Sequence, residues 1–182
     1  MDNHSNSASQ QSQALPPDDL RRQFSVARPD ADQTLRHVAV VGDVYTILLS
    51  GRDTAGRYAL IDMFVPPDGG PPPHRHDFEE MYHVLEGEVE VMFRGVKSIA
   101  HSGETVNFPA NAPHAFKNVS QRPARLLCMV SPPGAEDFFL ELGDPVASRT
   151  GPLPDLDKAA LAERASKGKA LAAKYKNEII AP

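Results

Sequence analysis

The chain has 182 residues, 41% of them hydrophobic, and a formal net charge of −5 at pH 7. This length suits one domain with extensions, and the negative charge gives no reason to expect nucleic acid or an anionic membrane as a partner. A single cysteine excludes an internal disulfide framework. No apolar run approaches the roughly 20 residues that span a bilayer, and the N-terminus has no signal-peptide pattern. We therefore expect a soluble, cytoplasmic protein that binds a small-molecule substrate, with no nucleic acid or membrane partner.

Residues 1–34 are predicted to form a flexible N-terminal arm. Its first half is rich in Ser, Asn and Gln and contains almost no apolar residues. Such a segment cannot bury enough surface to offset the entropy lost on ordering. We expect it to be disordered or to drape over a partner.

Residues 35–142 consist of short apolar runs that end at Gly, Pro or Asn. The clearest runs are VGDVYTILLSG, RYALIDMFVPP, EEMYHVLEGEVEVMFRG, GETVNFPANAPHAFKNVS and ARLLCMVSPPG. Several of them alternate, as Val89 and Val91 do against Glu88 and Glu90. This pattern is typical of an all-β sandwich or small barrel.

Residues 143–182 are predicted to form a linker and a C-terminal helical tail. Ala, Leu and Lys dominate this segment, and Asp155 or Asp157 can cap a helix. Gly168 weakens the middle of the helix and can divide it in two. An approximate apolar stripe comprises Leu156, Ala160, Leu161, Ala165, Ala172, Tyr175 and Ile179. We expect this helix to pack on the outside of the barrel or on a second subunit, with a lid over an active site as the alternative.

The metal-capable side chains share one face if their segments are extended strands. Side chains alternate along a strand, and the prolines before His74 favour an extended approach. His74 and His76 then project to one side, Glu80 lies on the same side of the following segment, and His114 joins them if the strands meet. The apolar residues predicted to line this inward face are Tyr82, Val84 and Phe116, with Phe64, Met92, Phe108 and Met129 as further candidates.

Two segments resemble the paired motifs of the cupin superfamily. The first motif is His-x-His, three residues, Glu, six residues, Gly, and it falls on His74, His76, Glu80 and Gly87. The second is Gly, five residues, Pro, x, Gly, two residues, His, three residues, Asn, and it falls on Gly103, Pro109, Asn111, His114 and Asn118. The resemblance implies a jelly-roll barrel over about residues 35–142.

Two positions depart from the family pattern. Asp68 stands where the first motif has its leading Gly, with Gly69 and Gly70 displaced beside it, and Asn111 replaces the middle Gly of the second motif. After glycine, asparagine best tolerates a positive φ angle, so we expect the turn at Asn111 to survive. Neither departure affects a ligand position.

The resemblance implies that His74, His76, Glu80 and His114 are metal ligands. Three imidazoles and one carboxylate suit one divalent transition metal, namely Mn, Fe, Ni, Co, Cu or Zn, better than calcium. Four protein ligands leave room on an octahedral or five-coordinate ion, as catalysis requires, whereas structural zinc closes its coordination.

The surroundings of the ligands favour an apolar substrate. Arg75 and Lys117 point away from the ligand face by strand parity, whereas a phosphosugar would need a cation beside the metal. The stretch GDVYTILLSGRDTAGRYAL, the set of three His and one Glu, and the late segment SPPGAEDFF resemble single-domain quercetin-dioxygenase-like cupins. This resemblance implies a metal-dependent dioxygenase acting on a small aromatic enol or flavonol-like substrate. In that reaction Glu80 is the catalytic base that accepts the hydroxyl proton.

Two other classes of function stay open from the sequence. One is a different metal-dependent enzyme, such as a lyase or isomerase, and the other is a cupin that binds a small molecule without catalysis. We also expect a homodimer, because cupins commonly pair and because the arm carries apolar residues such as Leu15, Leu20 and Phe24.

Overall fold

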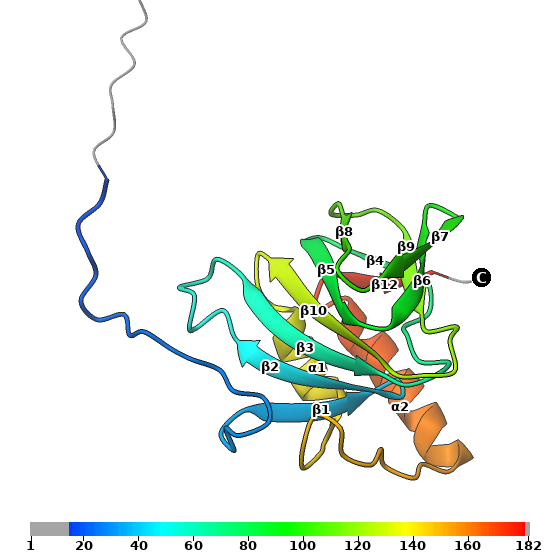
Figure 1. Ribbon diagram of the computed structural model, residues 1–182. Coiled ribbons are helices and arrows are strands. Elements are labelled where there is room, and N and C mark those ends of the chain that lie inside the picture. Colours follow the sequence, from blue (N-terminus) through cyan, green and yellow to red (C-terminus); the bar gives the residue numbers. More distant parts are fainter. Residues whose placement is uncertain (1–14, 181–182) are drawn as a thin grey trace, which may run out of the picture.

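The structure is a computed structural model and describes residues 15–180. Residues 1–14 of the predicted arm and residues 181–182 of the tail lie outside the described residues. The described part of the arm, residues 15–34, contains turns but no helix or strand (Figure 1). It contacts the rest of the protein through Arg22, which donates to the carbonyl of Asp53 at 3.3 Å, and through Asp30, which pairs with Arg149. Among the described residues no helix is long and apolar enough to cross a membrane.

Two antiparallel sheets form the body of the molecule (Figure 1). The first has seven strands in the order β11-β1-β2-β3-β10-β5-β8 and the second has five in the order β12-β4-β9-β6-β7. The strands are β1 (Arg36–Val40), β2 (Asp43–Leu49), β3 (Ala59–Val65), β4 (His74–His76), β5 (Glu79–Glu86), β6 (Glu88–Phe93), β7 (Val96–His101), β8 (Thr105–Phe108), β9 (His114–Lys117), β10 (Ala124–Ser131), β11 (Asp144–Pro145) and β12 (Asn177–Ile179). The predicted β fold is confirmed.

The hydrophobic core follows the alternation of the strands. In β10 the residues Ala124, Leu126, Cys128 and Val130 are buried, while the residues between them are partly exposed. β10 pairs with β3 on one side and β5 on the other, so this row lies at the centre of the larger sheet. Side chains that alternate in this way place one apolar face toward the core.

Residues with positive φ form the turns that shape the ligand-bearing loops. Asn111 has a φ of 66°, which confirms the expectation that asparagine can replace the glycine of this turn. Asp68, which stands in the other departing position, also has a positive φ, of 65°. Beside it, a Cβ on Gly70 would lie 2.2 Å from the carbonyl oxygen of Phe116, so no side chain fits there.

Within residues 15–180 the helices are α1 (Ala135–Leu142) and α2 (Lys158–Ala172). The predicted C-terminal helix is present as α2; Asp157 is its N-cap and accepts a hydrogen bond from the backbone N–H of Ala160 at 2.8 Å. Gly168 does not divide it. Two features were not expected from the sequence: α1 follows the last core strand, and the tail returns to the sheets through β11 and β12.

Candidate metal centre

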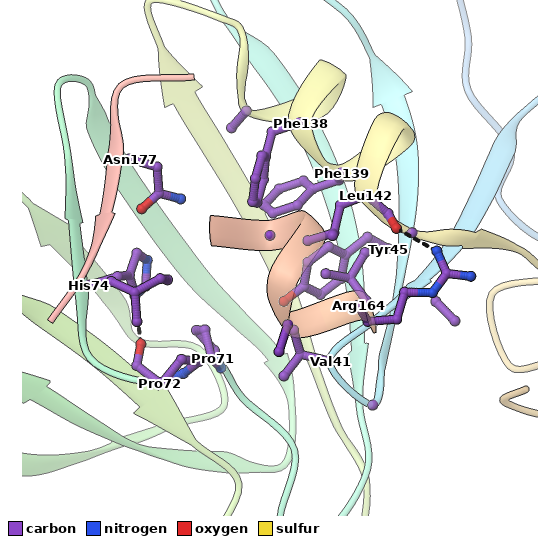
Figure 2. Close-up of a pocket in the computed structure, with 18 of the residues that line it drawn as sticks. Val41, Tyr45, Pro71, Pro72, His74, Phe138, Phe139, Leu142, Arg164 and Asn177 are labelled. Atoms are coloured by element: carbon purple, nitrogen blue, oxygen red, sulfur yellow. Dashed lines mark hydrogen bonds between the residues drawn. The ribbon is translucent and has the colours of Figure 1, made fainter. Parts of the chain in front are cut away.

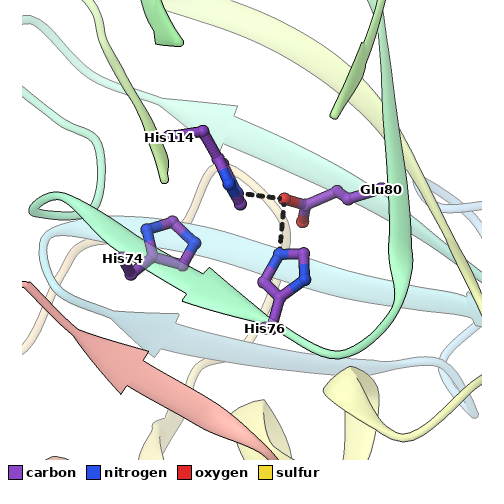
Figure 3. A group of neighbouring side chains, drawn as sticks. All are labelled: His74, His76, Glu80 and His114. Atoms are coloured by element: carbon purple, nitrogen blue, oxygen red, sulfur yellow. Dashed lines mark hydrogen bonds and ion pairs between the residues drawn. The ribbon is translucent and has the colours of Figure 1, made fainter. Parts of the chain in front are cut away.

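Four side chains from three strands meet at one point of the barrel (Figure 3). They are His74 and His76 of β4, Glu80 of β5 and His114 of β9. One ligand atom from each lies within 4.8 Å of all the others. All four residues are buried, with at most 7% of their surface exposed. The structure therefore brings together the four residues that the sequence predicted to share one face.

Alternation along β4 and β5 accounts for this arrangement. His74 and His76 are buried on one face of β4, whereas Arg75 between them is exposed and pairs with Glu178. In β5, Glu80 is buried, while its neighbour Glu79 is exposed. Antiparallel pairing then brings His114 of β9 opposite His74.

Each of the three imidazoles is held by a backbone carbonyl two residues away. In every case the ring nitrogen Nδ1 faces the carbonyl oxygen, so it carries the proton and Nε2 points into the cluster. Such contacts fix the tautomer and ring orientation of metal-binding histidines. The pairs are His74 with Pro72 at 2.9 Å, His76 with Phe78 at 3.1 Å and His114 with Ala112 at 2.8 Å.

The cluster requires positive charge beside Glu80. The Nε2 atoms of His76 and His114 lie 3.1 and 3.0 Å from the same oxygen of Glu80, Oε2. Because Nδ1 already donates to a carbonyl, Nε2 can donate as well only if the ring is an imidazolium cation. A metal cation bound by the Nε2 lone pairs satisfies the same geometry without buried imidazolium rings. The donor set therefore fits a divalent transition metal.

The size of the cluster is consistent with one ion after a small contraction. Nitrogen and oxygen ligands lie about 2.1 Å from such an ion, so two of them are at most about 4.2 Å apart. The observed limit of 4.8 Å is slightly larger. Aromatic packing holds the rings, since His114 stacks on Phe108 and His76 stacks on Phe78, with centroids 4.5 and 3.6 Å apart.

Two side chains of the cluster have the protonation states that metal ligands need. Burial, reinforced by the charge of His114, lowers the pKa of His74 to about 4, so this ring is neutral at pH 7. Burial opposes the ionisation of Glu80, but hydrogen bonds with His114 and His76 outweigh it and hold the pKa of Glu80 below its usual range. Neutral imidazole and ionised carboxylate are the forms that bind metals.

The cluster opens onto a cavity of about 690 Å³ (Figure 2). His74, His76 and Glu80 belong to its lining, whereas His114 lies behind them, fully buried. Most of the remaining lining is apolar, and seven of its residues are aromatic: Tyr45, Phe78, Tyr82, Phe116, Phe138, Phe139 and Tyr175. A cavity of this size suits a small organic molecule.

The predicted lining residues divide into two groups. Tyr82 and Phe116 line the cavity, and their rings contact each other with centroids 5.2 Å apart. Val84 is fully buried on the same face of β5 but lies outside the lining, because it is two residues, about 6.6 Å, further along the strand. The further candidates Phe64, Met92, Phe108 and Met129 are likewise outside the lining, and Met63 takes the place of Phe64.

Much of the cavity wall comes from α1, which was not predicted, and from the tail, whose role as a lid was only the alternative prediction. Phe138, Phe139 and Leu142 of α1 and a face of α2 close the side that faces the ligands (Figure 2). Five residues of the apolar stripe noted in the tail belong to this wall, namely Leu156, Leu161, Ala165, Tyr175 and Ile179. This stripe indicated that the tail helix could form a lid over the active site. That interpretation was only the alternative to a helix packed on the outside of the barrel.

The positions of the basic residues around the cavity agree only in part with the sequence-based expectation that no basic residue faces inward. Arg75 and Lys117 do point outward, where they pair with Glu178 and Asp68. However, Arg164 and Lys169 of α2 belong to the lining, which strand parity could not reveal. Arg164 is engaged within the protein, because it donates to the carbonyl of Leu142 at 2.9 Å and pairs with Asp144.

Comparison with known proteins agrees with this architecture. Residues 61–130 match the family model of the Cupin domain. Two solved structures share the fold: the polyketide cyclase RemF from Streptomyces resistomycificus (TM-score 0.53, 23% identity, covering 60% of this chain and 80% of that one) and a predicted oxalate decarboxylase from Thermotoga maritima (TM-score 0.52, 19% identity, covering 59% and 99%). Residues 61–130, which include all four residues of the cluster, are thus similar to a cupin domain, and the two solved structures support the same fold.

Two curated proteins are similar in sequence. An uncharacterized protein from Methanocaldococcus jannaschii is 26% identical over 112 residues, which are 60% of this chain and 90% of that protein. Quercetin 2,3-dioxygenase from Bacillus subtilis is 27% identical over 103 residues, which are 56% of this chain. The match spans only 30% of the length of that enzyme.

Proposed function

We propose that this protein is a metal-dependent dioxygenase that acts on a small aromatic enol or flavonol-like substrate. One observation carries the proposal: a cluster of three histidines and one glutamate lies at the end of an apolar, aromatic cavity of about 690 Å³. Metal ligands that line an apolar cavity are suited to chemistry on a bound organic molecule rather than to a structural metal.

The lining supports an aromatic, uncharged substrate. Phe116 and Tyr82 offer flat apolar surfaces close to the ligands, and Phe138 and Phe139 do so from α1. Next to the ligands, the basic residue Arg75 faces outward and is paired with Glu178. A phosphorylated or carboxylated substrate would need a cation at that place, so we favour an oxygen-bearing ring.

Glu80 is the proposed catalytic base. Its Oε2 is engaged by two imidazoles, whereas Oε1 accepts a hydrogen bond from the thiol of Cys128 at 3.5 Å. Oε1 is therefore the oxygen that can accept the proton of a substrate hydroxyl. When bound, a divalent transition metal would act as a Lewis acid on the substrate oxygen. It would also support the reaction of the substrate with dioxygen, both atoms of which enter the product.

The aromatic wall has a second proposed role. The enolate that forms when Glu80 accepts the proton is an electron-rich anion, which water would reprotonate. Tyr82 and Phe116, both at most 2% exposed, contribute apolar surface that excludes water from this end of the cavity. The similarity to quercetin 2,3-dioxygenase supports the same type of reaction.

Oxygen consumption tests the proposal directly. Protein reconstituted separately with Mn, Fe, Co, Ni, Cu and Zn is assayed in an oxygen electrode with a panel of flavonols and catechols. We expect at least one metal form to consume oxygen. The variant Glu80→Gln should keep much of its metal, because three imidazoles remain, and lose turnover by roughly 100-fold or more.

The exposed neighbour of Glu80 provides a matched control. Glu79 receives hydrogen bonds from Asn107 and from the backbone of Ala110 on the outer side of β5. Glu79→Gln should therefore retain turnover. If no metal form consumes oxygen with any compound, the dioxygenase proposal fails, and a lyase, an isomerase or a non-catalytic binding protein takes its place.

A further inference from the structure

We propose that the distal end of the cavity binds an apolar chain carried by the substrate, and that Val41 is a specificity-determining residue for this chain. The distal end is the part of the cavity lined by Val41, Leu153 and Leu161. The ring to which the chain is attached rests on the proposed function, in which it lies at the histidine cluster. All three residues lie outside the segments that resemble the cupin motifs.

One face of α2 runs along the cavity. The residues of α2 that line the cavity are Leu161, Arg164, Ala165, Gly168 and Lys169. Their spacing of three and four residues places them on a single face of the helix. At 1.5 Å per residue, this face extends about 12 Å along the cavity. The cavity is therefore elongated.

The far end of this face lies away from the histidine cluster. After α2 the chain continues into β12, where Asn177 lies opposite His76. Figure 1 shows the orange N-terminal end of α2 well away from β4 and β9, which carry the histidines. In Figure 2, Val41 and Arg164 lie on the side of the cavity away from His74. A ring held at the cluster thus leaves the distal end unfilled.

The distal end is lined by large apolar side chains that are exposed to solvent. Val41, Leu153 and Leu161 are 61%, 39% and 54% exposed. Apolar residues scattered singly on a surface are common, whereas several that border one cavity indicate a binding site. An apolar chain lying against them would remove part of this surface from water, which favours binding.

Val41 has a backbone conformation that valine rarely adopts. It has a φ of 52° and is followed by Gly42, with a φ of 91°, in the two-residue turn between β1 and β2. Positive φ angles at both positions are those of a type I′ turn, for which Asn-Gly is a preferred pair. A β-branched residue in this region is strained. The turn alone therefore does not account for valine, whereas an apolar contact at the cavity does.

The basic residues on the cavity face of α2 do not favour an acidic chain. Arg164 pairs with Asp144 and donates to the carbonyl of Leu142, so its charge is already compensated. Lys169 is exposed, so water and salt screen its charge. An uncharged alkyl chain therefore fits the distal end better than a chain that ends in a carboxylate.

Alkyl esters of gallic acid are suitable probes, because they share one hydroxylated ring and differ only in the length of the alkyl chain. Dissociation constants of methyl gallate and octyl gallate are measured by calorimetry on zinc-reconstituted protein without oxygen. We expect octyl gallate to bind at least about tenfold more tightly, since each methylene that leaves water contributes roughly a factor of four.

The variant Val41→Asn separates chain binding from stability. The Asn-Gly turn should leave the melting temperature unchanged or raise it, whereas the lost apolar contact should weaken octyl gallate binding roughly fourfold, about the effect of one methylene. Methyl gallate binding should change by less than about twofold. Leu161→Ser should have the same selective effect. Val96→Ser, which changes an exposed apolar residue outside the cavity, is the control and should leave the binding of both gallates unchanged.

Equal binding of the two gallates by the wild-type protein, or binding of neither, would overturn the inference. So would octyl gallate binding that Val41→Asn and Leu161→Ser leave unchanged, or that Val96→Ser weakens as much as Leu161→Ser does. If Leu161→Ser instead dissociates a dimer in sedimentation and the wild-type protein has no chain preference, the distal end is a subunit contact.

Oxygen uptake is a separate readout. A chain preference without oxygen uptake keeps this inference and removes the dioxygenase reaction, whereas oxygen uptake without a chain preference removes this inference alone.

Discussion

His74 on β4 and His114 on β9 are direct antiparallel partners, with ring centroids 4.4 Å apart. This pair joins the two sequence motifs, since His76 and Glu80 follow His74 closely and Asn111 precedes His114. The backbone N–H of Asn111 also donates to the carbonyl of His76 at 2.7 Å. The cluster thus depends on the register between two short strands as well as on the ligands themselves.

The first prediction concerns metal content. His76→Ala should abolish binding, because it removes one ligand atom and the ring that stacks on Phe78. His83→Ala should leave binding nearly intact, since His83 lies on the other face of β5 and its Nδ1 contacts Thr105 Oγ1 at 2.9 Å. Elemental analysis after reconstitution is the measurement, with about one metal per chain expected for the wild-type protein. A wild-type value far below one, or an equal loss in the two variants, would contradict the assignment.

Strand parity, a local rule, predicted that three of the four cluster residues share a face, whereas the place of His114 beside them followed from the resemblance to the second motif. Once residues near 74 and 80 are extended, the directions of His74, His76 and Glu80 follow from their spacing. The turn at Asn111 was predictable for a similar reason, because the backbone requirement is contained in one residue. The parity inference needed only the knowledge that the segments are strands, whereas the expectation of a turn came from the position of Asn111 in the second motif.

The cavity was less predictable because it depends on how distant segments pack. Asn177 reaches the cluster only because the tail folds back and adds β12 to β4, and no local pattern specifies that pairing. For Val84, strand parity correctly predicted the face of the strand on which the side chain lies. It did not predict how far along the strand the cavity extends, and Val84 lies beyond its end. Parity gives the face of a residue and says nothing about the extent of a cavity.

Gly168 offers a test of the packing of α2 against α1. A Cβ added at Gly168 would lie 3.8 Å from two methyl carbons of Leu142, which is an ordinary van der Waals contact. Alanine is favoured over glycine inside a helix by about 0.5–1 kcal/mol. Gly168→Ala should therefore raise the free energy of unfolding by about that amount, measured by urea unfolding. Gly70→Ala is the contrast, since its Cβ would collide with the backbone of Phe116, and a loss of stability in both variants would contradict this account of α2.

The predicted homodimer can be tested at the arm. Leu20 and Phe24 are 83% and 92% exposed, so their side chains are available to contact a second subunit. Sedimentation should show a dimer at micromolar concentration, and Leu20→Ser with Phe24→Ser should shift it toward monomer. Val96→Ser changes another exposed apolar residue, on β7, and should leave the dimer intact. A wild-type protein that sediments only as a monomer would remove the prediction.

The last prediction concerns Asp43, a fully buried carboxyl group next to the cavity wall. Its Oδ2 accepts a hydrogen bond from the hydroxyl of Tyr45 at 3.2 Å, and a Cβ on Gly69 would come within 2.3 Å of Oδ1. Burial raises the pKa of Asp43 from the ordinary 3.8 to about 7, although hydrogen bonds from Tyr45 and the backbone of Gly70 partly oppose the rise. The folded protein therefore retains a proton that the unfolded chain has already released.

The effect on stability has a definite sign. Below about pH 4 Asp43 is protonated in both states, and above about pH 7 it is ionised in both. Between these limits the folded state binds more protons, so the contribution of Asp43 to the free energy of unfolding falls as pH rises, by a total on the order of 4 kcal/mol. Asp43→Asn removes this dependence. The stability of the variant relative to wild type, from urea unfolding of chelator-treated protein, should increase steadily from about pH 4 to pH 7 and then level off. Parallel stability curves for the two proteins across this range would show that Asp43 ionises normally in the folded state.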